Sequence, residues 1–319
     1  MAMFDALNGS MNAAKACTLC PLECGADRAV EAGACGVGGF DKAVLGRLDP
    51  YLTALIARAA RHFFEEPPIS GTRGSGAIFF SGCNMACIFC QNHDISQTAK
   101  GRPVDASQLV DVMLRLQELG SHNINLVTPS PHTELLARAI LAARNSGLTI
   151  PVVYNTNAYE KVEALERLEG LIDIYLPDLK YRSPIPARKY SGRSDYFDFA
   201  SKALLEMQRQ CGVLATDESG IARRGVIVRH LVLPGSVDET RGVLDFIHEH
   251  MPIETHISLM SQYTPLAEGL PKPLDRRLLK REYERALEYA LALGFTNIYA
   301  QELDSADACF TPEFNGYFE

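Results

Sequence analysis

From Ala77 onward, short apolar runs alternate with longer amphipathic runs, and this alternation constrains the fold more than any other feature. Runs rich in β-branched or aromatic residues predict strands at 77–80, 123–128, 150–155, 172–177, 225–233 and 256–262. Runs with helical spacing predict helices at 105–120, 132–147, 161–170, 198–212, 236–250 and 276–294. Repeated strand–helix units are typical of parallel strands joined by crossover helices. The pattern predicts an α/β fold, either a partial barrel or an open doubly wound sheet.

The remaining segments divide the chain further. Residues 1–50 are rich in Gly and Ala and poor in large apolar residues, so a metal would have to hold this cysteine-rich module together. Residues 51–73 predict a helical linker, "DPYLTALIARAARHFFEE", that Pro67 and Pro68 end. The core then spans 74–300, and 301–319 form a tail. Asp105 suits a helix N-cap, and Gly147 and Gly294 suit helix ends.

Composition narrows the class of protein. Apolar residues make up 47% of the 319 residues and charged residues 22%, as in ordinary soluble proteins. The net charge of −8 argues against a nucleic-acid partner. No run approaches the roughly 20 apolar residues of a membrane helix, and the N-terminus lacks a signal-peptide pattern. We therefore expect a cytoplasmic protein whose nine cysteines are reduced and serve metal binding or catalysis.

Three cysteines, Cys83, Cys87 and Cys90, lie in one short loop after the first strand of the alternating series. Ligand sites in parallel α/β folds lie at the carboxyl ends of strands, so the loop is placed for chemistry. Three thiolates can hold three corners of a cuboidal iron–sulfur cluster and leave one iron open for a substrate. The alternatives are a zinc site completed by His93 and inert buried thiols.

The segment "GCNMACIFCQN", with Phe89 just before the last cysteine, resembles the signature of the radical S-adenosylmethionine (SAM) superfamily. Six further segments resemble an uncharacterised subgroup of the branch related to pyruvate formate-lyase activating enzymes: "EEPPISGTRGSG", "NINLVTPS", "YNTNAYE", "YLPDLKY", "RHLVLPG" and "LMSQYTP". This resemblance implies a partial (β/α)6 barrel like a TIM barrel, with the small cysteine-rich extension at its N-terminus. It also implies a 4Fe-4S cluster that cleaves SAM reductively to a 5′-deoxyadenosyl radical.

The same resemblance implies SAM contacts at the ends of strands. Asp178 and Lys180 match a D-x-K segment that binds the carboxylate end of SAM and a nearby cation, and their alternative is a solvated ion pair. Asn155 and Asn157 match a D-T-N segment in which Asn155 replaces the Asp; their alternative is a polar turn. Arg229 matches an Arg near SAM. If it is buried, it needs an anionic partner, either SAM or Asp178.

Other positions differ from the family pattern or match it less closely. Where the family has Gly-Gly-Glu for the SAM amino group, this chain has Thr128, Pro129 and Ser130, whose hydroxyls and carbonyls can accept from an ammonium group but carry no carboxylate. Tyr263, with Gln262, stands where the activating enzyme has a His that contacts SAM; the alternative is a core tyrosine. His230, next to Arg229, is expected to be a core histidine.

A second group of cysteines occupies the N-terminal module: Cys17, Cys20, Cys24 and Cys35. Four thiolates satisfy either a closed iron–sulfur cluster or tetrahedral zinc, and both alternatives stay open. The two remaining cysteines, Cys211 and Cys309, are expected to be plain thiols.

Three functions are consistent with these features. The first is radical SAM chemistry on a protein or peptide, including installation of a glycyl radical in a partner. The second is the same chemistry on a small molecule. The third is an iron–sulfur electron carrier that does not cleave SAM. For the first two, we expect a flavodoxin- or ferredoxin-type electron donor.

Overall fold

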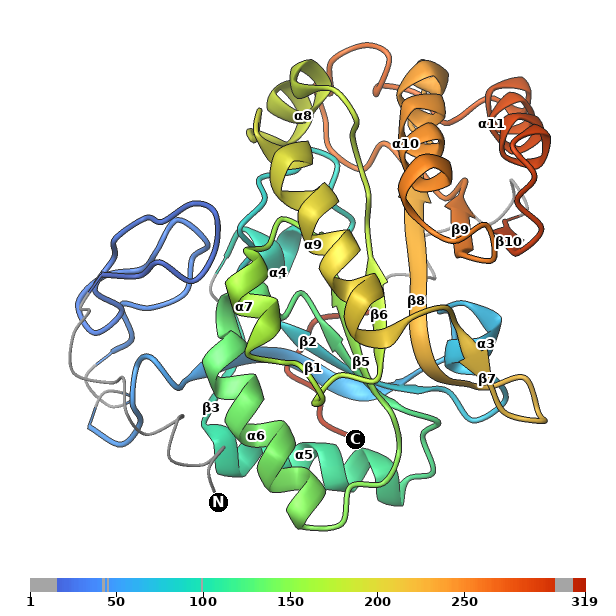
Figure 1. Ribbon diagram of the computed structural model, residues 1–319. Helices are drawn as coiled ribbons and strands as arrows, with labels where there is room; N and C mark the ends of the chain where they lie inside the picture. The colour runs from blue at the N-terminus through green and yellow to red at the C-terminus, as the bar shows by residue number, and fades with distance from the viewer. Residues whose placement is uncertain (1–15, 42–43, 45, 99, 302–311) are drawn as a thin grey trace.

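The computed structural model describes residues 16–41, 44, 46–98, 100–301 and 312–319 (Figure 1). One sheet runs through the molecule in the order β10-β9-β8-β6-β5-β4-β2-β1-β3, and β7 pairs with β8 at its side. The strands are β1 Ala54–His62, β2 Ser75–Phe80, β3 Arg102–Val104, β4 Ile124–Val127, β5 Val152–Thr156, β6 Ile174–Pro177, β7 Ala215–Thr216, β8 Ala222–Leu231, β9 His256–Met260 and β10 Ile298–Ala300. From β2 to β10 neighbouring strands are parallel, whereas β1 is antiparallel to both β2 and β3.

Helices connect the parallel strands, and α7, α9 and α10 cross in front of the sheet in Figure 1. They are α3 Pro67–Ser70, α4 His93–Ser96, α5 Ala106–Glu118, α6 Thr133–Asn145, α7 Val162–Glu166, α8 Pro184–Ser191, α9 Tyr196–Cys211, α10 Val237–His250 and α11 Lys280–Ala292, with a short 3-10 helix η1 at Ser130–His132. Asp105 accepts from the Gln108 backbone N–H at 2.9 Å in a capping box, as expected for the start of α5. The six predicted strands and their helices are confirmed, and the architecture is a partial (β/α)6 barrel.

The sheet has two differently used faces. Ile78 and Phe80 of β2 pack in the large core shared with the helices, together with Leu126 and Tyr154. Alternate residues, such as Ala77, face the other way into smaller apolar clusters, which we call the inner face. Because side chains alternate along a strand, Asn125 and Asn155 also belong to the inner face. The barrel therefore encloses polar side chains as well as apolar ones.

The helix expected in the linker 51–73 is wrong, because residues 54–62 form β1. The run is rich in Ala and Arg, which are good helix formers, and its apolar spacing fits a helix. Yet six of the nine residues are buried, and β1 lies between β2 and β3 in the sheet. Pairing with β2 therefore overrides local propensity. Pro67 and Pro68 do not end a helix but begin α3, where proline at the first positions is favoured.

The tail segment 312–319 lies along β1. Ala59 donates its N–H to the Tyr317 carbonyl at 2.9 Å, and Glu319 donates its N–H to the Ala59 carbonyl at 2.9 Å. The Glu319 carboxylate also pairs with Arg61 at 2.7 Å. This pairing covers backbone groups on β1 that would otherwise be an open edge. Cys309, expected to be a plain thiol, lies outside the described residues.

Deleting residues 316–319 is expected to lower the free energy of unfolding and to promote aggregation, because it exposes that edge. Urea unfolding and light scattering measure the two effects.

Glu319→Gln keeps the backbone pairing and should lower the free energy of unfolding by less than about 1 kcal/mol. Arg61 lowers the pKa of Glu319, so the pair stabilises fully above the ordinary glutamate pKa and is lost as pH falls through the lowered value. Equal stability of the deletion and the parent would contradict the role of the tail.

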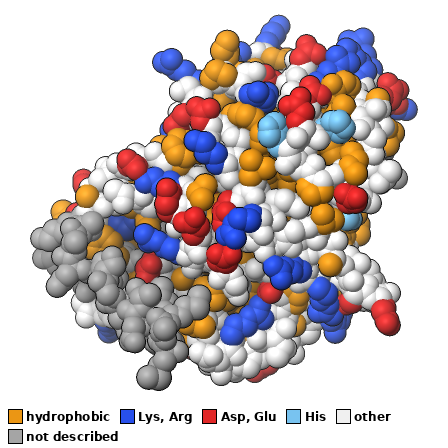
Figure 2. All heavy atoms as spheres, viewed as in Figure 1, with side chains coloured by type: hydrophobic (Ala, Val, Ile, Leu, Met, Phe, Trp, Pro, Cys, Tyr) orange, Lys and Arg blue, Asp and Glu red, His pale blue; other side chains and the backbone are white. Residues whose placement is uncertain are grey.

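On the face shown in Figure 2, basic and acidic side chains are interspersed. In the described part of the chain, no helix has both the length and the apolar character needed to cross a bilayer.

Candidate functional site at the carboxyl ends of the strands

The three-cysteine loop connects β2 to α4, and its thiols are surrounded by hydrogen-bond donors. All three cysteines are partly exposed. The donors to sulfur are the Met85 N–H and Asn157 Nδ2 on Cys83 (both 3.4 Å), Ser191 Oγ on Cys87 (3.0 Å) and Ser96 Oγ on Cys90 (3.4 Å). Donors of this kind stabilise negative charge on metal-bound sulfur and tune its redox potential.

The electrostatics of the thiols indicate what they require. Burial, together with the neighbouring Cys87 and Cys90, raises the pKa of Cys83 to about 12. Burial also raises the pKa of Cys87, while the positive charge of Lys180 acts in the opposite direction. A bound cation or cluster would supply the positive charge that favours the thiolate form of these side chains. Three adjacent cysteines with donors to each sulfur fit an iron–sulfur cluster held at three corners.

His93, the fourth ligand of the zinc alternative, opens α4. Its side chain is 61% exposed and pairs with Asp94 at 3.0 Å. Among the described residues, no group of three or more His, Cys, Asp or Glu side chains is positioned to hold a metal ion.

Asp178 and Lys180 follow β6 and form an ion pair, Nζ to Oδ2 at 2.5 Å. Burial would lower the pKa of Lys180, but the charges of Asp178 and Cys87 outweigh burial and raise it. The pair is largely buried, unlike the solvated ion pair that is the alternative. It also lies close enough to Cys87 for its charge to act on that thiol.

Arg229 is largely buried, and two glutamates rather than Asp178 are its direct anionic partners, while Asp178 acts on it through its charge. Its guanidinium donates to Glu66 at 2.7 Å and also to Glu65, whose side chains are only 5% and 8% exposed. It also donates to Asn155 Oδ1 at 3.1 Å. Burial would lower the pKa of Arg229, but the two carboxylates raise it. The inner face therefore holds two buried carboxylates against one guanidinium.

The two asparagines of "YNTNAYE" serve different neighbours. Asn155 lies in the Arg229 network, and its Nδ2 is 3.4 Å from Glu65. Asn157 reaches the cluster loop, where its Nδ2 donates to Asn84 Oδ1 at 2.9 Å besides Cys83. The structure therefore brings the end of β5 into contact with the cysteine loop, as expected for the carboxyl ends of parallel strands.

Thr128 and Ser130, at the end of β4, lie in contrasting environments. Thr128 has φ +60°, a strained value for a β-branched residue, and its N–H donates to the Asn155 carbonyl at 3.0 Å. Such strain clusters at functional sites. Ser130 is buried and donates to Glu160 Oε1 at 2.5 Å. The hydroxyl expected to serve the SAM amino group is therefore engaged with a carboxylate of this chain.

Phe89 and Tyr263 lie edge to face, with ring centroids 6.0 Å apart. Tyr263 is buried and donates its hydroxyl to the Leu274 carbonyl at 2.5 Å, an arrangement typical of a core tyrosine. Next to it, the Gln262 carbonyl accepts from Gln91 Nε2 of the cysteine loop at 3.1 Å. His230 is confirmed as a core histidine: its ring nitrogens lie 2.6 Å from the Leu179 carbonyl and 2.9 Å from Thr240 Oγ1.

The N-terminal module that carries Cys17, Cys20, Cys24 and Cys35 forms a loop region beside the barrel (Figure 1). Cys17 and Cys24 are hydrogen-bonded, and the charges of Cys17 and Cys24 act on Cys35. Burial raises the pKa of Cys20 to about 11, with Cys35 and Cys17 adding to the rise. The four thiols therefore lie close enough to act on one another electrostatically, and a metal centre shared by them stays a prediction.

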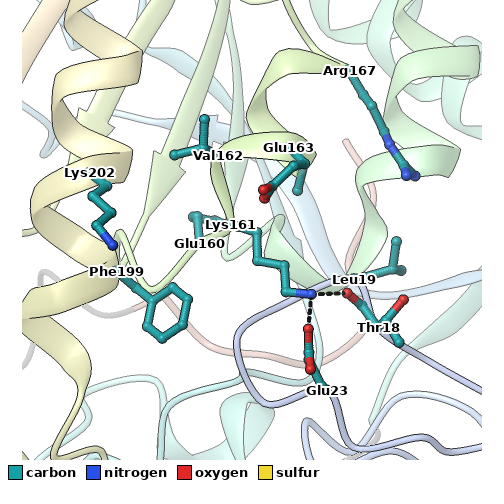
Figure 3. Close-up of a pocket in the computed structure, with 11 residues that line it drawn as sticks. Thr18, Leu19, Glu23, Glu160, Lys161, Val162, Glu163, Arg167, Phe199 and Lys202 are labelled. Atoms are coloured by element: carbon teal, nitrogen blue, oxygen red, sulfur yellow. Dashed lines mark hydrogen bonds and ion pairs between the residues drawn. The ribbon is translucent and has the colours of Figure 1, made fainter.

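A cavity of about 420 Å³ separates this module from α7 and α9 (Figure 3). Lys161 crosses it and donates to the Thr18 carbonyl at 3.0 Å and to Glu23. The cavity lies at the junction of module and barrel, and its lining includes Glu160, which contacts Thr156 at the end of β5.

Several residues at the site were not identified from sequence. Ser191 and Ser96 belong to helices whose serines carry no chemical label, and their contact with sulfur depends on tertiary packing. Glu65 and Glu66 had a usable signal, because they open the quoted segment "EEPPISGTRGSG". Two acids directly before a Pro-Pro pair are conspicuous, but only the fold places them beside Arg229.

Comparison with known proteins identifies a family model and two relatives. A family model described as the radical SAM superfamily matches residues 77–247. Two curated relatives come from Methanocaldococcus jannaschii. The uncharacterised protein MJ0674 is 30% identical over 90% of this chain and 78% of its own. The uncharacterised protein MJ0808 is 25% identical over 67% of this chain and 61% of its own.

Solved structures match with lower identity. Streptococcus suis SuiB bound to S-adenosylmethionine has 14% identity and a TM-score of 0.46, covering 69% of this chain and 48% of its own. The FeFe-hydrogenase maturase HydG from Carboxydothermus hydrogenoformans has 15% identity and a TM-score of 0.42, covering 68% and 50%. The chain thus spans about half the length of these structures. Because the family model matches more than half of the chain, from β2 to α10, the chain belongs to the radical SAM superfamily.

Proposed function

We propose that the protein is a radical SAM enzyme whose substrate is a protein or peptide, with installation of a glycyl radical in a partner as the first form to test. Membership of the superfamily implies a 4Fe-4S cluster and SAM as cofactors. Bound at Cys83, Cys87 and Cys90, the cluster would supply the electron for reductive cleavage of SAM. The observation that carries the proposal is the set of three partly buried thiols with hydrogen-bond donors, at the carboxyl ends of the strands.

The chain's own residues would bind SAM and orient it. Lys180, held by Asp178, places a buried positive charge near Cys87 that suits the carboxylate end of SAM. Thr128 and Asn157 lie at neighbouring strand ends, where they would contribute polar contacts to SAM. Arg229 would act on the site through Asn155 rather than as a free receptor for an anion, since Glu65 and Glu66 neutralise it. The resemblance to activating enzymes supports the choice of a protein or peptide substrate.

The test of this function has two stages. Anaerobically reconstituted protein, reduced chemically, is incubated with SAM, and 5′-deoxyadenosine and methionine are measured; we expect both products. A flavodoxin- or ferredoxin-type protein of the cytoplasm should replace the chemical reductant. Candidate protein partners are then added, and electron paramagnetic resonance (EPR) detects a protein radical. Absence of 5′-deoxyadenosine would leave only the electron-carrier function, and SAM cleavage without any protein radical would favour a small-molecule substrate.

Asp178→Asn tests the ion pair. Loss of the carboxylate removes the group that holds Lys180 in place, so we expect the KM for SAM to rise about 10-fold or more while iron content is unchanged. Asp217→Asn is the matched control: Asp217 also pairs with a basic side chain, that of Arg223, but in the turn between β7 and β8. Steady-state formation of 5′-deoxyadenosine against SAM concentration gives both constants. An unchanged KM in Asp178→Asn would exclude this pair from SAM binding.

A further inference from the structure

The two groups of cysteines are joined directly through the backbone. Cys83, which opens the three-cysteine loop, donates its N–H to the carbonyl of Cys35 at 3.0 Å. One cysteine of each group is therefore connected to the other by covalent bonds and a single hydrogen bond. No function yet assigned to the strand-end site accounts for this connection.

Gly82 permits the close approach of the two loops. It has φ +89°, and a Cβ at this position would lie 2.7 Å from the Cys35 carbonyl oxygen and 2.7 Å from Val37 Cγ2. A Cβ practically never tolerates a backbone atom at that distance, so any side chain at residue 82 would force the loops apart. The contact between the cysteine groups therefore depends on a glycine.

Two further contacts hold the N-terminal module on the barrel. Arg28, buried within the module, donates to the Pro131 carbonyl at 2.8 Å. Lys161 of the barrel donates to the Thr18 carbonyl and Glu23, as Figure 3 shows. With the Cys35–Cys83 contact, these anchors surround the module on several sides and fix its distance from the three-cysteine loop.

The surroundings of the four thiols suit a negatively charged metal centre. A Cβ on Gly33 would lie 3.2 Å from Cys24 Sγ and 3.6 Å from Cys35 Sγ, so this glycine leaves space between two of the sulfurs. The Arg28 guanidinium lies 3.5 Å from Cys17 Sγ, and its charge also acts on Cys24 and Cys35. A buried cation beside four cysteines offsets the negative charge that a cluster with four thiolate ligands carries.

We propose that Cys17, Cys20, Cys24 and Cys35 hold a second iron–sulfur cluster that relays electrons to the three-cysteine centre through the Cys35–Cys83 contact. This inference rests on the proposed function, which needs one electron for each SAM cleaved. In each relay step, an external ferredoxin- or flavodoxin-type reductant gives one electron to the N-terminal cluster. That cluster then gives one electron to the cluster at Cys83, Cys87 and Cys90, so one centre is oxidised as the other is reduced and no bond is broken.

The first test uses the full chain, purified and reconstituted without oxygen. Elemental analysis should find about eight iron atoms per chain, falling to about four in a Cys17→Ala, Cys20→Ala double variant. EPR of the reduced parent should show the two centres broadened by magnetic interaction, and the double variant should show one unbroadened signal. Zinc in place of the additional iron, or two signals without interaction, would overturn the relay.

The second test changes only the junction. Gly82→Ala should retain the iron of both centres but weaken the magnetic interaction in EPR. It should also slow SAM cleavage driven by a protein donor. Gly120→Ala is the matched control, because Gly120 has a similar φ of +87° but no atom within 4 Å of an added Cβ. If Gly82→Ala matches the parent in EPR, the Cys35–Cys83 contact is not the path.

Failure of the relay and failure of the proposed function are distinguishable. With a strong chemical reductant, the cluster at Cys83, Cys87 and Cys90 receives electrons directly. SAM cleavage that survives in the Cys17→Ala, Cys20→Ala variant under chemical reduction, but not with a protein donor, supports the relay. Parent protein that yields no 5′-deoxyadenosine with either reductant refutes the proposed function instead.

Discussion

Cys87→Ala yields no 5′-deoxyadenosine from SAM and retains little iron at the three-cysteine loop, while the chain stays folded. Two thiolates cannot hold a cuboidal cluster that needs three corners and an open fourth iron. The side chain of Cys87 is only partly buried and its main interaction is with Ser191, so alanine removes little packing. The expected loss of SAM cleavage is complete to the limit of detection.

Product analysis, iron content and far-UV circular dichroism on the same preparation measure these effects. Cys211→Ala is the matched control, because Cys211 is a buried thiol at the end of α9, outside both cysteine groups, whose Sγ donates to the Ile172 carbonyl at 3.5 Å. It should keep both iron and activity. SAM cleavage by Cys87→Ala at the parent's rate would remove the basis for a cluster at this loop.

Arg229→Leu lowers the free energy of unfolding by about 3–5 kcal/mol, the largest stability effect expected of any single change. Leucine leaves Glu65 and Glu66 buried without their cation, while Asn125 and Asn155 supply only neutral donors. Buried carboxylates without a counter-charge take up protons instead, so we expect the variant to be relatively more stable at low pH.

Urea unfolding at several pH values measures this change. Arg209→Leu is the control, because Arg209 also pairs with two glutamates, Glu169 and Glu206, but is 53% exposed. An exposed pair is worth at most about 1 kcal/mol. If both variants lose the same free energy of unfolding, burial of the inner-face network adds nothing to stability. Glu66→Gln, which leaves one carboxylate for one guanidinium, should cost less than Arg229→Leu.

Local patterns were sufficient wherever the chemistry is local. The six parallel strands, their helices, the N-cap at Asp105 and the three-cysteine loop were all predicted from spacing and composition. The pair Asp178–Lys180 was also found from sequence, because residues two apart on an extended segment point the same way. These features depend on contacts within a few residues or on the repeating strand–helix unit.

Two predictions failed for reasons that lie in long-range contacts. β1 was expected to be a helix, because its Ala and Arg residues favour one and nothing local shows that β2 will pair with it. Asp178 was one of two candidate partners of Arg229, but the direct ion pairs are with Glu65 and Glu66, which are 164 and 163 residues away. Residue type required an anion there, but it did not identify which one.

The amino-acid sequence by itself determined that this is an α/β protein with cysteines at the carboxyl end of its first parallel strand, because both follow from periodicity and spacing along the chain. Only the tertiary structure decided which groups face each other: Arg229 with two glutamates, Ser191 with Cys87, and Cys35 with Cys83. Such pairs form when packing brings distant segments within hydrogen-bond distance, and no local pattern records that distance.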